Sequence, residues 1–345
     1  MTVVKRIVGN PLIRADDITG RNESLEVIGA FNPGVTEFNG GVLLLLRVAE
    51  RVKPNDKTVG VPIASDGEIK ISEFQKSDKD WDFSDSRVIT QRGGKKLLTS
   101  LSRLAVARSL DGARFELTGG GIFPETEYEE YGIEDPRITK IENKYYITYS
   151  AVSSKGICAV LRVTDNFIDF ESRGVILCPD NKDAAIFPEK IGGRYYILHR
   201  PSGSEFSPPE IWLAESPDLA CWGNHRHLMG VRRGRWDGVR IGSSSVPIKT
   251  DKGWLVLYHG ADINNRYCLG AFLLDAERPW IVTGRTDKPF LEPELPYETD
   301  GFFGNVVFAC GCVRSGDTLK IYYGAADDKV CRADVGLNDI FDAMR

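Results

Sequence analysis

The hexapeptide Gly132-Ile133-Glu134-Asp135-Pro136-Arg137 places two adjacent carboxylates before a proline and an arginine, just upstream of an apolar aromatic run. Proline pushes the residue before it into an extended conformation, so we expect Asp135 on a stiff segment and not at a loop tip. Arg137 could hold a carboxylate in place or lower its pKa by proximity. A turn with a surface salt bridge would explain this hexapeptide equally well, so the choice depends on the rest of the chain.

Five apolar and aromatic runs, each ending in a polar residue, recur along the chain and predict strands. The runs are Gly41–Arg47, Lys144–Ser150, Arg194–Arg200, Gly253–His259 and Thr318–Gly324. Each has one strand-like segment before it and another after it. A four-stranded unit that recurs five times predicts an all-β fold, a five-bladed β-propeller with a short C-terminal helix over 337–345. A two-sheet β-sandwich would not need five matched units and is the less favoured alternative.

The whole chain, 1–345, is predicted to form a single catalytic domain. Its first unit carries an insertion of about fifty residues, roughly 49–101, whose middle is charged and rich in turn residues. This stretch is expected to be a long excursion or a contact between copies of the chain, which leaves a homo-oligomer open.

Charge and composition exclude several classes of protein. The net charge of −5 is not that of a typical nucleic-acid-binding protein. The longest apolar run, Val42–Leu46, is too short to cross a membrane. The N-terminus lacks the apolar segment of a signal peptide. Seven cysteines form no CxxC pair and four histidines show no zinc-ligand spacing. We therefore expect reduced thiols, a cytoplasmic location and no metal.

Polar residues at equivalent positions of the five units should converge at one end of a central channel. Starts of first strands supply Asn32, Asp135, Lys182, Asp183, Ser243 and Asn305; ends of aromatic strands supply Arg47, His199, Arg200, Tyr258, His259 and, just beyond, Asp327. Each residue alone could be a turn cap or a solvated charge. Scattered surface polarity, however, would not follow the repeat.

One acid that faces several cations suits acid-assisted bond cleavage with an anion as the other reactant. An inverting glycosidase needs two carboxylates, because one must activate water. A glycoside phosphorylase needs only the acid, since phosphate already carries the nucleophilic charge and requires cations to bind it.

The chain resembles glycoside hydrolase family 130, the inverting β-mannoside phosphorylases and some β-mannosidases, from about Asn10 to Val335. The motifs that carry the resemblance are Phe31–Gly34, the strand ending in Arg47, Gly132–Arg137, Asn181–Asp183 with Phe187–Lys190, His199–Pro201, Glu215–Asp218 with Trp222–His225, Trp254–Gly260, Asn305–Phe308 and Tyr322–Asp327. The resemblance implies a five-bladed propeller. It also implies reversible phosphorolysis of β-manno-oligosaccharides to α-mannose 1-phosphate, with inorganic phosphate as co-substrate and no cofactor.

The resemblance also implies roles for individual residues. Asp135 is the expected general acid, acting through the 3-hydroxyl of the mannose that is cleaved. The expected phosphate contacts are Arg47, Lys182 and His199. The expected sugar contacts are Asn32 and Asp327, to which we add Arg137, Asp183, Tyr258, His259 and Asn305. Members that act on β-1,2-linked mannosides are the most similar at Ile133-Glu134, Asp262–Arg266 and Phe302–Asn305.

Three alternatives remain at this point. A β-mannosidase would use water and need a base; Glu134 is a candidate, but as the neighbour of Asp135 in an extended segment it should point the other way. A β-1,4-mannoside phosphorylase would share the same machinery. A non-catalytic carbohydrate-binding propeller could use the aromatic rings Tyr128, Tyr131, Trp236 and Phe302, and would tolerate Asp135→Asn.

Overall fold

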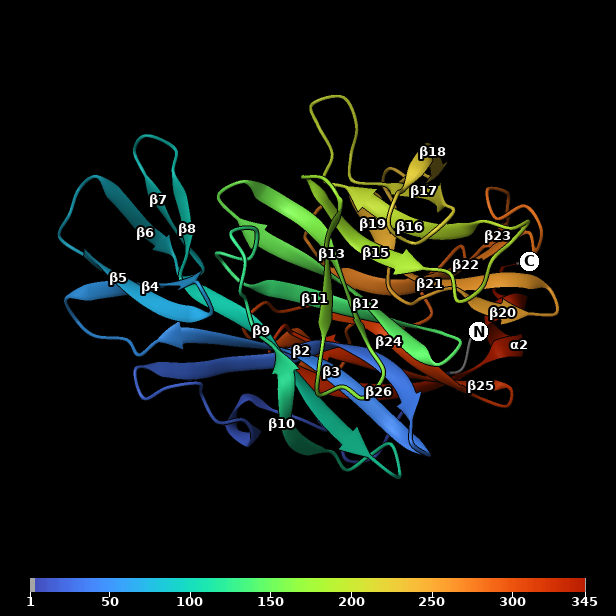
Figure 1. Cartoon of the computed structure of the whole chain (residues 1–345), viewed down its shortest axis with the longest axis horizontal. Coiled ribbons are helices and arrows are strands. Elements are labelled where there is room, and N and C mark those ends of the chain that lie inside the picture. The colour runs from blue at the N-terminus through green and yellow to red at the C-terminus, as the bar shows by residue number, and fades with distance from the viewer. Residues whose placement is uncertain (1–3, 345) are drawn as a thin grey trace.

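The computed structural model describes residues 4–344, and within that range nearly all regular structure is β (Figure 1). The helical elements of this range are η1, a 3-10 turn (Ala15–Asp17), α1 (Pro296–Thr299) and α2 (Leu337–Asp342). The prediction of an all-β fold with a short C-terminal helix is therefore confirmed. None of the helices in the described range is long and apolar enough to cross a bilayer.

Five sheets share one antiparallel pattern, in which strands close in sequence pair side by side. The first contains β2 (Leu25–Phe38), β3 (Gly41–Val52), β9 (Ser100–Ser109) and β10 (Glu116–Ile122). The second contains β11 (Ile133–Ile141), β12 (Lys144–Ser153), β13 (Gly156–Thr164) and β14 (Glu171–Leu177). The third contains β15 (Asn181–Ile186), β16 (Tyr195–Pro201), β17 (Ile211–Ser216) and β18 (Gly223–Met229).

The fourth sheet follows the same order with one extra strand, and the fifth takes its outer strand from a distant part of the sequence. The fourth contains β19 (Arg240–Ser243), β21 (Gly253–Ala261), β22 (Tyr267–Leu274) and β23 (Val282–Arg285), with β20 (Ile248–Thr250) also paired to β21. The fifth contains β24 (Val307–Ser315), β25 (Thr318–Ala325), β26 (Lys329–Gly336) and, from the other end of the chain, β1 (Val4–Arg6).

The N-terminal strand thus completes the C-terminal sheet. Val4 lies opposite Val335 and Arg6 opposite Ala333 in the antiparallel ladder between β1 and β26. The Nε of Arg6 also donates to Oε1 of the buried Glu298 at 2.7 Å. Both the ladder and this ion pair hold the first strand on the last sheet.

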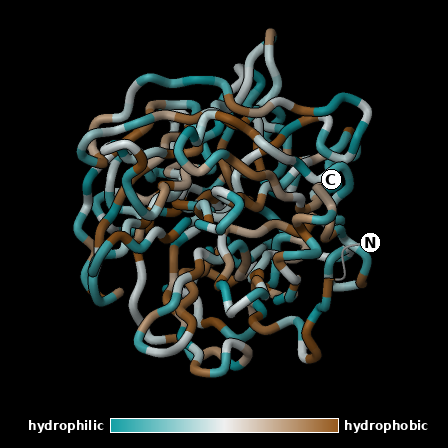
Figure 2. Tube along the Cα trace, turned by 90° about the vertical axis from the view of Figure 1, so that its right-hand side faces the viewer, coloured by the Kyte–Doolittle hydropathy of each residue, from teal (hydrophilic) through white to brown (hydrophobic). Residues whose placement is uncertain are grey.

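An apolar core lies between each pair of neighbouring sheets. On β3, Leu43 and Leu45 pack toward the second sheet, whereas Leu44 and Leu46 pack toward the fifth. The run Val42–Leu46 is continuously apolar because both faces of its strand are covered. Three further cores lie between the second and third, third and fourth, and fourth and fifth sheets. Figure 2 shows brown, hydrophobic stretches running through the interior and teal segments in many outer loops.

The first strands of the sheets also contact one another. β2 contacts both β24 and β11, β11 contacts β15, and β15 contacts β19. Polar residues at the starts of these strands can therefore meet, as the repeat predicted.

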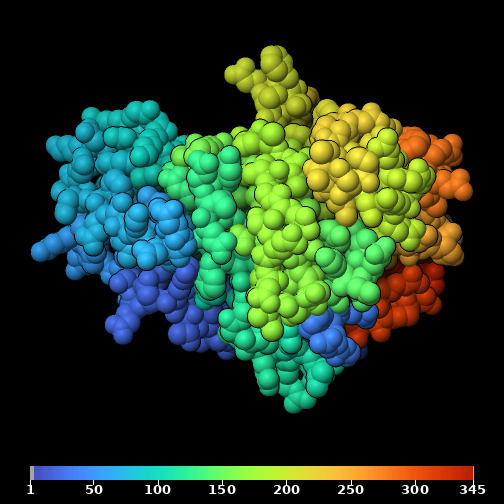
Figure 3. Space-filling model, in the orientation of Figure 1, coloured from blue at the N-terminus to red at the C-terminus, as the bar shows by residue number. Residues whose placement is uncertain are grey.

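The long stretch between β3 and β9 forms two small sheets of its own. One contains β4 (Thr58–Ser65) and β5 (Glu68–Gln75); the other contains β6 (Trp81–Asp85), β7 (Val88–Gln91) and β8 (Lys96–Leu98). Figure 3 shows them as a lobe at the left of the molecule. Val61, Ile89 and Leu97 form a small core there with Tyr131 and Val152. The excursion is therefore packed against the second sheet, and its Arg87 can reach the pocket described next.

Candidate active site

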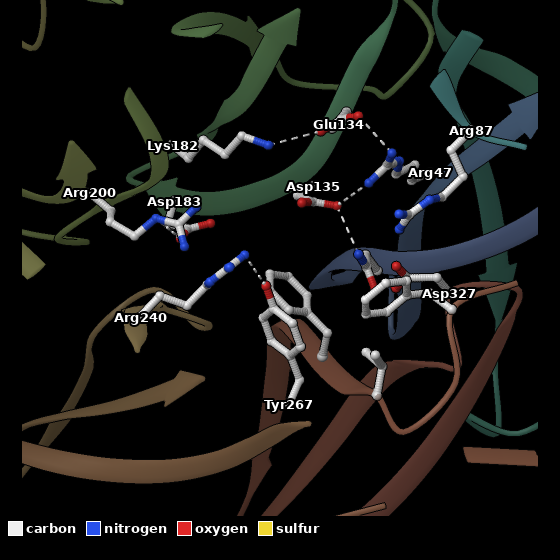
Figure 4. A pocket seen from close by; sticks show the side chains of 14 residues that line it. Arg47, Arg87, Glu134, Asp135, Lys182, Asp183, Arg200, Arg240, Tyr267 and Asp327 are labelled. Carbon is white, nitrogen blue, oxygen red and sulfur yellow. Dashed lines mark hydrogen bonds and ion pairs between the residues drawn. The ribbon is translucent and has the colours of Figure 1, made fainter. Parts of the chain in front are cut away.

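A cavity of about 270 Å³ gathers charged residues from all five sheets (Figure 4). It is lined by Asn32, Arg47, Arg87, Glu134, Asp135, Lys182, Asp183, Arg200, Arg240, Tyr267, Phe303, Val306, Phe308 and Asp327. Cations and carboxylic acids thus face each other across a small volume, with an aromatic wall on one side. Such a cavity suits a polar ligand that carries hydroxyl groups and an anion.

Backbone irregularities aim three of the polar side chains into this cavity. Asn32, Asp135 and Asp183 have φ of 46°, 51° and 55°, and each lies where the register of its strand shifts. Asn and Asp are the non-glycine residues that most readily adopt this left-handed conformation. A bulge breaks the alternation of a strand and re-aims the side chain it carries. The residue types at these positions are therefore dictated by backbone geometry as well as by chemistry.

Asp135 is held on one oxygen. Its Oδ1 accepts hydrogen bonds from Asn32 Nδ2 at 2.9 Å and Arg47 Nη1 at 3.2 Å. Burial alone would raise the pKa of Asp135, but the positive charges of Arg47, Arg137 and Lys182 outweigh it and hold that pKa below its ordinary value. These cations therefore hold Asp135 as a carboxylate, and it needs a change in the surrounding charge to carry a proton.

Glu134 also lines the cavity, contrary to the expectation that it would point away from Asp135. Its Oε1 accepts from Arg47 Nη2 at 2.7 Å and its Oε2 from Lys182 Nζ at 3.3 Å. The expectation was wrong because the bulge at Asp135 breaks the alternation on which it relied. Arg47 and Lys182 both reach the cavity as predicted, and Glu134 bridges them.

Asp183 is the centre of a buried ion cluster. Arg137 Nη2 donates to its Oδ1 at 2.9 Å, and Arg200 Nε and His259 Nε2 lie 3.1 and 3.4 Å from its Oδ2. Burial would raise the pKa of Asp183, but Arg200, Arg137 and His259 together hold it well below the ordinary range. A methyl group on Gly242 would come within 2.1 Å of Oδ2, so that glycine leaves room for the carboxylate.

Two predicted sugar contacts, Arg137 and His259, lie behind the cavity wall. Arg137 donates from Nη1 to the backbone oxygen of Asp135 at 2.7 Å, and its side chain is almost wholly buried. His259 is buried, its Nδ1 lies 3.2 Å from Ser244 Oγ, and burial lowers its pKa. Both residues support the carboxylates and do not themselves line the cavity.

Asp327 reaches the cavity from the turn after β25, as predicted. Burial raises its pKa to about 7, with a contribution from Asp135 and Glu134 that Arg47 opposes. The proton that Asp327 then holds near neutral pH can be donated to a ligand oxygen.

The structure does not bring Tyr258, Asn305 or His199 to the cavity lining. Tyr258 points to the opposite side of β21 from His259 and donates to the buried carboxylate of Asp237 at 2.8 Å. Asn305 is exposed, and its backbone oxygen accepts from Tyr267 N at 3.1 Å. Phe303 and Val306, close to Asn305 in the sequence, line the cavity with apolar side chains in its place.

His199 is buried with both ring nitrogens occupied. Nδ1 lies 3.1 Å from Asn181 Oδ1, and Nε2 lies 3.1 Å from His225 Nδ1. Burial and the neighbouring His225 lower its pKa to about 3, so the ring is neutral. Side chains alternate along a strand, so the residue after His199 faces the other way. That residue, Arg200, lines the cavity next to Lys182, its partner on the neighbouring strand.

Arg87, Arg240 and Tyr267 line the cavity but were not predicted. Arg240 Nη1 donates to Tyr267 OH at 3.0 Å, and the guanidinium of Arg87 lies 5.0 Å from the ring centre of Phe303. Arg240 begins the first strand of its unit, so its position in the repeat was a usable signal. Arg87 belongs to the excursion, where the repeat gives no guide.

Comparison with known proteins agrees with this geometry. The family model for glycoside hydrolase family 130, described as β-1,4-mannooligosaccharide phosphorylase, matches residues 86–345. The chain is a member of glycoside hydrolase family 130. This family 130 chain is 48% identical over 344 residues to β-1,2-mannobiose phosphorylase of Listeria innocua serovar 6a, covering 98% of this chain and 97% of that one.

One further relative and one solved structure are informative. This family 130 chain is 44% identical over 246 residues to 1,2-β-oligomannan phosphorylase of Thermoanaerobacter sp. strain X514, covering 70% of this chain and 80% of that one. The solved complex of the Listeria innocua enzyme with β-1,2-mannobiose superposes with a TM-score of 0.95 at 47% identity, covering 99% of both chains. The family predicted from the motifs is therefore confirmed.

Proposed function

We propose that this family 130 chain is an inverting phosphorylase that cleaves β-1,2-linked manno-oligosaccharides with inorganic phosphate and releases α-mannose 1-phosphate. The proposal depends mainly on one contact: Asp135, the residue predicted to protonate the leaving group, pairs with Arg47. Arg47 and Lys182 are the cations predicted to bind phosphate, and both pair with Glu134 beside Asp135. The relatives with the two highest identities reported above bear the names of β-1,2-mannoside phosphorylases, which supports this linkage over β-1,4.

We propose a five-bladed β-propeller that forms one catalytic domain. This is supported by the five sheets of matching order, by the contacts among their first strands and by the five cores between successive sheets. In such a ring the first strand of each blade faces the axis, and the cavity lies at one mouth of the channel.

The proposed reaction breaks the bond between C1 of the terminal mannose and the bridging oxygen. Asp135 gives its proton to the 3-hydroxyl of that mannose, and the hydroxyl passes its own proton to the bridging oxygen. A phosphate oxygen bonds to C1 from the opposite face, which inverts its configuration. The proton lost from hydrogen phosphate on becoming the sugar phosphate returns Asp135 to its acid form, so the protons balance.

In this proposal Arg47 and Lys182 bind phosphate, with Arg200 beside Lys182. Asn32 and Asp327 contact the mannose that is cleaved. His199 would first have to release His225 before it could donate to phosphate. Arg137 and His259 position Asp135 and Asp183 from behind the wall.

We also propose that the enzyme works in the cytoplasm without a metal or other cofactor. All seven cysteines are free thiols, as expected in a reducing compartment.

The second candidate function is a β-mannosidase that uses water, and Glu134 in the cavity is the observation that favours it. Incubation of β-1,2-mannobiose with and without inorganic phosphate separates the two functions. We expect mannose 1-phosphate and mannose in equal amounts, only when phosphate is present. Two molecules of mannose at the same rate in phosphate-free buffer would establish the hydrolase instead.

Linkage and the non-catalytic alternative need their own measurement. Reverse reactions with mannose 1-phosphate and mannose as acceptor should yield the β-1,2-linked disaccharide; a β-1,4 product would overturn the linkage. A carbohydrate-binding propeller would release no phosphate in this assay.

A further inference from the structure

Glu134 lies between the two cations that are proposed to bind phosphate. Its carboxylate oxygens are 2.7 Å from Arg47 Nη2 and 3.3 Å from Lys182 Nζ, and Figure 4 shows the two cations directed at it from opposite sides. Its side chain lines the cavity and is 12% exposed. An anion that binds Arg47 and Lys182 together must therefore come close to a carboxylate.

The contacts around Glu134 hold it in this place. The guanidinium of Arg47 is fixed by Ser102 Oγ at 3.1 Å and by Asp135 at 3.2 Å, and it stacks 4.8 Å from the ring centre of Phe31. On the backbone side, Glu134 pairs with Ser150 in the ladder between β11 and β12. A ligand would have to break the ion pairs with Arg47 and Lys182 to displace the Glu134 carboxylate. We therefore expect the carboxylate to stay in the cavity when an anion binds.

A carboxylate in an anion-binding site distinguishes anions that carry a proton from anions that carry none. It repels a bare oxyanion oxygen but accepts a hydrogen bond from an oxygen that bears a proton. Phosphate keeps at least one proton at neutral pH, whereas sulfate has none. The same two cations without Glu134 would bind both anions.

We propose that Glu134 is a specificity-determining residue that accepts a hydrogen bond from the P–OH group of hydrogen phosphate and excludes sulfate. The inference rests on the proposed function, because it assumes that phosphate binds at Arg47 and Lys182. It also places the transferable phosphate proton on the Glu134 side of the anion.

The test compares phosphate and sulfate on the wild type, on Glu134→Gln and on Glu130→Gln. Glutamine keeps the shape of Glu134 but offers an amide N–H to sulfate, so sulfate should become a competitive inhibitor against phosphate. One charge-assisted hydrogen bond is worth about 10–100-fold in affinity, so the ratio of the sulfate inhibition constant to the phosphate KM should fall by that factor. Glu130 contacts Ser154 away from the cavity, and its variant should behave as the wild type.

Calorimetric titration of each protein with sulfate and with phosphate gives the same comparison without turnover. Weak sulfate binding to the wild type and tight binding to Glu134→Gln would support the proposal. Equal competition by sulfate in both proteins would overturn it. If the glutamine variant does not fold, Glu134→Asp serves in its place. The shorter side chain moves the carboxylate away from the anion, so the exclusion of sulfate should weaken. Failure of the wild type to use phosphate at all would instead refute the proposed function.

Discussion

Arg47 Nη1 lies 3.2 Å from Oδ1 of Asp135, so a cation proposed to bind phosphate also contacts the proposed acid. The charge of Arg47 helps to keep the pKa of Asp135 low, although burial works in the opposite direction. A dianion bound to Arg47 and Lys182 would offset their charge. Phosphate binding should therefore raise the pKa of Asp135 and let it hold the proton that it must donate.

The first prediction is a pH profile that depends on phosphate. The acid form of Asp135 is lost as pH rises through its pKa, so the alkaline limb of activity should lie at higher pH in saturating phosphate than in limiting phosphate. By linkage, phosphate affinity should rise as pH falls through the same pKa. Asp135→Asn should remove this dependence and leave the ionisations of phosphate and of Asp327, whose pKa is raised to about 7. An alkaline limb at the same pH in saturating and in limiting phosphate would contradict the proposed effect of phosphate on the pKa of Asp135.

The second prediction concerns Asp135→Asn. Asparagine tolerates the left-handed backbone at this position, so the fold should survive, but the transferable proton is lost and kcat should fall about 10²–10⁴-fold. A dinitrophenyl β-mannoside, whose leaving group needs no proton, should recover much of that loss. Lys182→Ala is the comparison: its phosphate KM should rise about 10–100-fold and the activated substrate should not rescue it. Equal rescue of both variants would show that Asp135 is not the acid.

The third prediction uses a glycine beside Asn32. A methyl group at Gly324 would come within 2.0 Å of Asn32 Oδ1, so Gly324→Ala must displace the amide that holds Asp135. We expect a loss of about 1–3 kcal/mol of unfolding free energy, measured in urea, together with reduced kcat. Gly223→Ala is the matched control, because no heavy atom beyond its two chain neighbours lies within 4 Å of its added methyl group. Wild-type kcat in Gly324→Ala would argue that Asn32 does not position the acid.

The fourth prediction concerns the buried cluster around Asp183. Asp183→Asn leaves Arg137 and Arg200 without their shared carboxylate and should cost about 3–5 kcal/mol in urea unfolding. Asp287→Asn removes an exposed carboxylate that is paired with Arg235 and should cost at most about 1 kcal/mol. The pKa of Asp183 is depressed, so its contribution is present above its ordinary pKa of 3.8 and is lost as pH falls further. Equal costs for the two substitutions would refute this role of burial.

The fifth prediction is that activity on β-1,2-mannobiose is unchanged after exhaustive chelation. The described part of the chain contains no group of three potential metal ligands, and the proposed chemistry uses only side chains and phosphate. The measurement is phosphorolysis before and after treatment with EDTA. Activity that is lost and then restored by one divalent ion would overturn the prediction.

The sequence was most informative where side-chain pattern follows backbone geometry. The run Val42–Leu46 predicted a strand, and the structure shows why it is apolar throughout: both of its faces are covered. The repeat also predicted that Asn32, Asp135, Asp183 and Asp327 would converge, because equivalent positions of equivalent units meet at one place.

Two of the wrong predictions share a physical cause. Glu134 was predicted to point away, and His199 was chosen over Arg200, because a bulge or a shift of one residue changes the face that a side chain occupies. No pattern of residue types marks such a shift reliably. Arg87 was missed for another reason: it reaches the cavity from an excursion that has no counterpart in the other units.

The pairing of β1 with β26 also bears on the biosynthesis of the protein. Val4–Arg6 are synthesised before the strands of the other four sheets, whereas Lys329–Gly336 are synthesised after them. The intervening sheets can form in order as they emerge, but β1 has no partner strand until β26 has been made. An exposed strand edge in an incomplete chain can pair with another copy. Nascent chains stalled before β26 are therefore the species in which aggregation should begin.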